Sequence, residues 1–277
     1  MNVDANPNND EWLNILKDAL AQAFPNSQIS DDIDSMAQFT KSKNIGWHSD
    51  ETSKQLGVAF LNETDRDIKS CRVLCSKKIY PHAIYHFQQA VEKAMKAYCL
   101  GLGILSIEEI RGHDTPYVLL KGLFEKTGMK AMFKGSNSQS KILLDKAWEV
   151  KDDPVKRLGI AKMPFDQIMY ELECIDADSQ RAKLIADATQ AVLFKAAQSK
   201  GVNKPALPLI LLTFHIMPCL YRLSVISFPH EAFTRYPDDE EMTPADYVSE
   251  LGIVKALPKM INYLATAVKE LRTSFSK

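Results

Sequence analysis

The sequence predicts an all-α protein, and three observations support this prediction. Glycine accounts for only 11 of the 277 residues. Stretches of alternating apolar and polar residues are nearly absent, and apolar residues recur every three to four positions from end to end. The chain is 45% hydrophobic, which is enough to build a full core. We therefore expect a globular protein made of packed helices.

Two helices are expected within the first fifty residues. The segment EWLNILKDALAQAF predicts a helix over about 10–24, and SDDIDSMAQF suits another, capped by Ser30 or Asp31. We interpret residues 1–50 as a helical extension that precedes the main bundle of residues 51–277.

A pair of long helices is expected next. The first covers about 53–77, and the second covers 80–101. Pro81 separates them, because a proline disfavours the α conformation at the preceding Tyr80 and suits the first turn of a new helix. So short a turn predicts antiparallel packing. The apolar positions of the first helix include Leu56, Phe60, Ile68, Cys71, Leu74 and Cys75.

The remaining chain also indicates helices. One is expected after His113, with Asp114 or Thr115 as its cap and Pro116 in its first turn. Residues 165–198 suit one long helix or a pair, within a region of about 128–204 that we interpret as an insertion. Residues 205–228 predict a buried helix kinked by proline. A last helix is expected over about 244–274, capped by Thr243 and with a kink near Pro258.

Composition narrows the classes of function. The formal charge of -1 and the pI near 6.6 give no overall basic field, so nucleic-acid binding would need a local patch. The five cysteines include no Cys-x-x-Cys pair and suit a reducing cytoplasm. The start MNVDANPNND does not resemble a secretory signal. We expect no membrane span, because Pro208, His215, Pro218 and Arg222 interrupt the most apolar segment.

The helix expected at 80–101 carries a polar stripe opposite its apolar face. At 100° per residue the apolar face collects Ala83, Ile84, Phe87, Ala90, Val91, Ala94, Met95 and Tyr98. The opposite arc collects His82, Tyr85, His86, Gln89, Glu92, Lys93 and Lys96. Histidine exchanges protons near neutral pH and lysine binds phosphate, so the stripe is either a phosphate-facing site or an ordinary solvated surface.

Three elements of the sequence together resemble the HEPN domain (higher eukaryotes and prokaryotes nucleotide-binding). They are QAVEKAMKA from Gln89 to Ala97, His113-Asp114, and Arg235-Tyr236-Pro237. The resemblance covers about 55–125 and 205–275. It implies an antiparallel bundle of four or five helices, often a homodimer, of the kind found in RNA-processing, anti-phage and toxin-antitoxin proteins. A nucleotidyltransferase-type antitoxin is one partner that it suggests.

Many HEPN proteins are metal-independent ribonucleases with an arginine, four to six residues and then a histidine. This chain departs from that spacing. Seven residues separate Arg222 from His230, and nine separate Arg72 from His82. The resemblance therefore supports either an RNA-cleaving protein or a non-catalytic module that binds a nucleotide or a protein partner.

The candidate residues follow from this resemblance and from the polar stripe. If the protein cleaves RNA, the acid-base group is expected among its histidines and the phosphate is expected to contact an arginine; the candidates are His82, His86, His113, Arg222, His230 and Arg235. The candidate contacts to nucleotide or RNA phosphate are Gln89, Glu92, Lys93 and Lys96. His82 and His86 have the spacing of metal ligands, but no third ligand is evident, so we expect neither a metal nor another cofactor.

Overall fold

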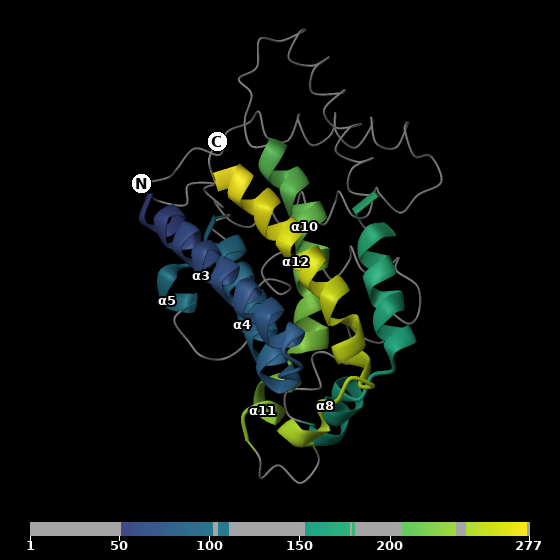
Figure 1. Ribbon diagram of the computed structural model, residues 1–277. Helices are drawn as coiled ribbons and strands as arrows, with labels where there is room; N and C mark the ends of the chain where they lie inside the picture. Colours follow the sequence, from purple (N-terminus) through teal and green to yellow (C-terminus); the bar gives the residue numbers. More distant parts are fainter. Residues whose placement is uncertain are drawn as a thin grey trace, which may run out of the picture.

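The computed structural model describes residues 51–101, 105–110, 153–177, 179–180, 207–236 and 242–275. Within these ranges every regular element is a helix and there is no strand, so the predicted all-α class is confirmed (Figure 1). The elements are α3 (Glu51–Ser76), α4 (Tyr80–Gly101), α5 (Ile107–Ile110), α8 (Pro154–Ala161), α10 (Leu207–Ser227), α11 (His230–Phe233), the 3-10 helix η2 (Pro244–Asp246) and α12 (Gly252–Phe275). Residues 165–177 are also helical. The expectations for residues 1–50, for His113 and for the helix after it lie outside the described residues.

The predicted antiparallel pair is α3 and α4, and a tight turn joins them (Figure 1). Lys78 has a φ of 61°, which is the left-handed conformation that ends many helices. The amide of Ile79 donates to the carbonyl of Leu74 at 2.9 Å, and the amide of Lys78 donates to the carbonyl of Cys75 at 3.0 Å. These two bonds form a Schellman motif, which ends α3 where the sequence predicts.

The longest helices that the structure describes, α3, α4, α10 and α12, pack around one core. α4 contacts the other three, and the short helix α11 also packs against it. Each residue of the predicted apolar face of α4 is buried, so the core side of this helix is confirmed. Because α4 has neighbours on several sides, little of its surface remains for solvent.

α10 is the buried, proline-containing helix predicted from the apolar segment. Pro218 lies inside it, and residues from Ile216 to Ser227 are buried. The buried side chains here include Arg222, within α10, and His230, at the start of α11. Among the helices that the structure describes, none has a stretch long and apolar enough to cross a membrane.

The predicted start of the last helix is wrong. Thr243 and Asp246 form a capping box, but they cap only the single 3-10 turn η2, and α12 begins at Gly252. The chain leaves the helical path at Tyr247, whose hydroxyl lies 2.8 Å from Nδ1 of His230 in the interior. A Cβ at Gly252 would lie 2.3 Å from the carbonyl oxygen of Met163. Tertiary packing therefore sets the start of α12, against the local capping signal.

The described part of the predicted insertion packs into the same core. α8 begins with Asp153, whose carboxylate accepts from the amide of Lys156 at 3.1 Å, and Pro154 occupies its first turn. Residues 165–177 follow as a helix. The buried side chains of this region that join the core are Ile160, Ala161, Met163, Ile168, Leu172 and Ile175. This region also carries the carboxylate of Glu171, whose partner lies in α10.

Candidate functional site

Three charged side chains meet where α3 packs against α4. The carboxylate of Asp67 lies 2.8 Å from Nδ1 of His86 and 2.5 Å from Nζ of Lys93. The side chain of Asp67 is 12% exposed, whereas those of His86 and Lys93 are 31% and 27% exposed. We call these three residues the Asp67 cluster. It places an imidazole and an ammonium group side by side at a partly open surface.

The carboxylate fixes the chemistry of His86. An ionised carboxylate only accepts hydrogen bonds, so Nδ1 of His86 donates to Asp67. Nε2 is then the ring atom that remains to contact a ligand. Asp67 was not among the residues predicted from the sequence. The sequence pattern that could have indicated it is an acidic residue on the buried face of α3. Asp67 lies three residues after Thr64 and four before Cys71, both of which are buried.

An arginine just after α11 extends this surface. The guanidinium carbon of Arg235 lies 4.9 Å from the centre of the Tyr85 ring, and Tyr85 meets His86 edge to face with ring centres 5.6 Å apart. The aromatic ring attracts the guanidinium and limits its motion. Tyr85 therefore links Arg235 to His86 of the Asp67 cluster, although Arg235 follows Lys93 by more than a hundred residues. His82, one turn before His86, is exposed.

The other end of the predicted stripe is less accessible. Glu92 is buried, and its carboxylate bonds Nζ of Lys96 at 2.9 Å and Nε2 of Gln88 at 3.5 Å. Gln89 is half-buried and donates to Gln88 at 2.7 Å. Lys96 also lies over the Phe60 ring of α3, 5.9 Å from its centre. α3 therefore covers this part of the stripe, and these groups bind one another.

Arg222 and His230, the pair nearest to a ribonuclease spacing, lie in the interior. Arg222 is 4% exposed and pairs with Glu171, which is 2% exposed. His230 is 1% exposed, and its Nδ1 bonds the hydroxyl of Tyr247. The structure does not bring either residue together with the Asp67 cluster.

Burial lowers the pKa of His230 from its ordinary value of 6.5 to about 3. The folded state thus keeps this ring neutral, while the unfolded state binds a proton below pH 6.5. The histidine contributes fully to stability above that pH, and its contribution falls as the pH drops toward 3. We expect the free energy of unfolding to fall by about 1.4 kcal/mol for each pH unit below 6, measured by urea titration at pH 7, 6 and 5.

The variant His230→Gln isolates this effect, because an amide can still bond Tyr247 but does not titrate. The wild type and the variant should differ in the slope of stability against pH. Equal slopes between pH 7 and 5 would show that His230 is not the responsible group.

Comparison with known proteins links this geometry to a family. Residues 58–151 match the family model described as the HEPN domain. The resemblance to the HEPN domain is confirmed for these residues. Comparisons with curated proteins and with solved structures each found no match. All three residues of the Asp67 cluster lie within the matched part. Arg235, which belongs to the third sequence element of the resemblance, lies beyond it.

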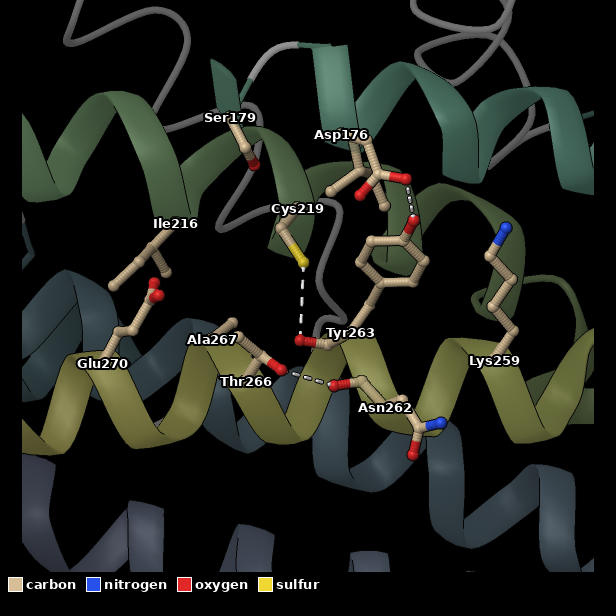
Figure 2. Close-up of a pocket in the computed structure, with 11 residues that line it drawn as sticks. Asp176, Ser179, Ile216, Cys219, Lys259, Asn262, Tyr263, Thr266, Ala267 and Glu270 are labelled. Atoms are coloured by element: carbon tan, nitrogen blue, oxygen red, sulfur yellow. Dashed lines mark hydrogen bonds between the residues drawn. The ribbon is translucent and has the colours of Figure 1, made fainter. Parts of the chain in front are cut away.

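Two hollows in the described part of the chain are lined by residues that follow the matched range of 58–151. The larger, about 440 Å³ in volume, lies between α10, α12 and the segment that carries Ile175, Asp176 and Ser179 (Figure 2). Its charged lining residues are Asp176, Lys259 and Glu270. The Tyr263 hydroxyl donates to Asp176, and burial together with that carboxylate raises the pKa of Tyr263. Burial raises the pKa of Cys219 to about 12. Two carboxylates against one ammonium disfavour an anionic ligand here.

The smaller hollow has the opposite balance of charge. It measures about 140 Å³ and lies beside α11. Arg157 and Arg235 line it, with Glu231 as the acidic lining residue. Across the described residues, no group of three His, Cys, Asp or Glu side chains is placed to hold a metal ion. Basic side chains are the feature that the Asp67 cluster and the smaller hollow have in common.

Proposed function

We propose that this protein binds RNA or a nucleotide through phosphate contacts on the surface that joins α3, α4 and α11. The observation that carries the proposal is the Asp67 cluster with Arg235 beside it. His86, Lys93 and Arg235 supply hydrogen-bond donors to one surface from separate parts of the chain. Charge-assisted hydrogen bonds of this kind are the strong contacts to phosphate oxygens. The match to the HEPN domain supports the same class of ligand.

Several candidate residues do not contribute to this surface. Glu92 is buried and bound to Lys96, and Arg222 and His230 are in the core. A general acid or base must reach the substrate within hydrogen-bonding distance. We therefore do not propose that Arg222 and His230 cleave RNA. We favour a protein that binds RNA or a nucleotide without cleaving it.

Cleavage of RNA by His86 is the second function that we propose to test. The specific observation in its favour is the hydrogen bond between Asp67 and Nδ1 of His86, 2.8 Å long. A carboxylate in this position holds an imidazole in one orientation and one tautomer. Lys93 would then face the charge that develops on the phosphate.

The test is incubation of the purified protein with single-stranded and structured RNA in EDTA, with binding measured in parallel. Binding that leaves the RNA intact supports the first proposal, a protein that binds without cleavage. Binding with cleavage that His86→Gln abolishes supports the second proposal, cleavage by His86. Absence of binding to every RNA and nucleotide at low salt would overturn both proposals.

The wider setting is also a proposal, and the HEPN domain is its support. We propose a homodimer in the cytoplasm, in a prokaryotic defence or toxin-antitoxin system, with a nucleotidyltransferase as the alternative kind of partner. Sedimentation at several protein concentrations tests the dimer. Sedimentation as a monomer at all concentrations would contradict it.

A further inference from the structure

The smaller hollow, which we call the arginine pocket, is built by parts of the chain outside the HEPN match. Arg157 comes from α8, and the rest of the lining comes from the segment that follows α10 and contains α11. Its lining residues are Arg157, Phe228, Pro229, Glu231, Ala232, Arg235 and Tyr236. No part of the family signature predicts Arg157 in this position.

Both guanidinium groups lie over aromatic rings. The guanidinium carbon of Arg157 lies 5.7 Å from the centre of the Phe228 ring, and that of Arg235 lies 4.9 Å from the centre of the Tyr85 ring. The face of an aromatic ring attracts a guanidinium, which carries five N–H donors in a fixed planar geometry. Arg235 also donates to Glu231 at 2.7 Å. The rings therefore limit the motion of both cations before any ligand arrives.

Charge and size define what the pocket can hold. Two arginines against one glutamate give the lining a formal charge of +1, by counting the ionisable residues that line it. The volume of about 140 Å³ is smaller than the roughly 300–1,000 Å³ of pockets that enclose whole drug-sized ligands. The pocket thus suits one small anionic group, with the rest of the ligand outside.

We propose that the arginine pocket binds a phosphate monoester, either at the end of an RNA strand or on a mononucleotide. A monoester carries about -1.5 to -2 charges at neutral pH and has three terminal oxygens. Two guanidinium groups can donate to those oxygens at once. A phosphate inside a strand has only two such oxygens and a single charge. This inference rests on the proposed function, and it specifies the form of the phosphate.

Two features around the pocket fit such a ligand. Tyr236 lines it and is 55% exposed, so its ring is available to stack on the terminal base. Arg235 joins the pocket to the Asp67 cluster through Tyr85 and His86. A strand with its terminal phosphate in the pocket would run toward His86 and Lys93, where its next phosphates find donors.

The experiment compares RNA oligonucleotides of one sequence that carry a 5′-phosphate, a 3′-phosphate or only hydroxyl ends, together with a nucleoside monophosphate. We expect the wild type to bind one of the two phosphorylated RNAs, with either the 5′- or the 3′-phosphate, about tenfold more tightly than the hydroxyl RNA. A tenfold difference in Kd is about what one charge-assisted hydrogen bond contributes. Arg157→Gln should remove that preference and leave the Kd of the hydroxyl RNA unchanged. Glu231→Gln should strengthen binding of the phosphorylated RNA, because it removes the opposing charge.

Lys156→Gln is the matched control, because Lys156 precedes Arg157 in α8 but does not line the pocket. It should leave the preference intact, and melting temperatures should show that all variants fold. Equal binding of phosphorylated and hydroxyl RNA by the wild type would overturn the inference while leaving the proposed function standing. If neither RNA nor the nucleoside monophosphate binds, the proposed function and the inference both fail. Nucleoside monophosphate binding that Arg157→Gln abolishes would support the pocket even if no RNA binds.

Discussion

Glu171→Leu lowers the free energy of unfolding by about 3–5 kcal/mol, because it removes the carboxylate that pairs with a buried arginine. Arg222 is 4% exposed and Glu171 is 2% exposed, so water cannot replace the missing partner. The pair also joins α10 to the helix of residues 165–177. Urea unfolding followed by circular dichroism measures the change.

Two further variants separate this effect from a loss of packing. Glu171→Leu with Arg222→Met removes both charges and should recover much of the stability, because no buried charge remains. Asp65→Asn breaks a pair with Arg272 whose side chains are 47% and 36% exposed, and it should cost no more than about 1 kcal/mol. A double variant less stable than Glu171→Leu would contradict the charge argument.

Lys93→Gln combined with Arg235→Gln weakens RNA binding by about a hundredfold or more at low salt. A hydrogen bond to a charged group contributes roughly 1.5–3 kcal/mol, and the two side chains bind separate phosphates in our proposal. The salt dependence should also fall, by about one unit of slope for each phosphate that is no longer bound. Titration of a labelled single-stranded RNA at several salt concentrations measures both quantities.

The substitutions are chosen to keep the fold intact. Glutamine at position 93 keeps a donor near the carboxylate of Asp67, which is 2.5 Å from Nζ of Lys93 in the wild type. Lys259→Gln on α12 removes a cation that lines the larger hollow instead, and it is the control for a general reduction of positive charge. If Lys259→Gln weakens binding as much as the double variant does, the proposed surface is wrong.

Periodicity was sufficient to predict much of this fold. The predicted apolar face of α4 is buried residue by residue, and Pro81 correctly marked the boundary between α3 and α4. These features are local, because a helix repeats every 3.6 residues and proline restricts its immediate neighbour. The residue at which α12 starts could not be predicted from the local sequence. It depends on the close approach of Gly252 to Met163 and on the bond between Tyr247 and His230.

Less of the candidate site than of the fold could be predicted from the sequence, because the site depends on contacts between helices. A helical projection of α4 placed His86, Glu92 and Lys93 on one polar arc, but it could not reveal that α3 covers Glu92. It also gave no information on which residue of another helix meets that arc. Asp67 and Glu171 are acids at buried positions of their own helices. Such a residue indicates a partner charge elsewhere, but only the packing of the helices identifies the partner as Lys93 or Arg222.

Ultraviolet cross-linking of the protein to single-stranded RNA, with the adducts located by mass spectrometry, tests the proposed surface most directly. We predict adducts in the segment of α4 that contains Tyr85, His86 and Lys93, and at Arg235 or Tyr236, with less adduct at high salt. Adducts confined to α12 around Tyr263, or spread evenly over the chain, would contradict the proposed surface.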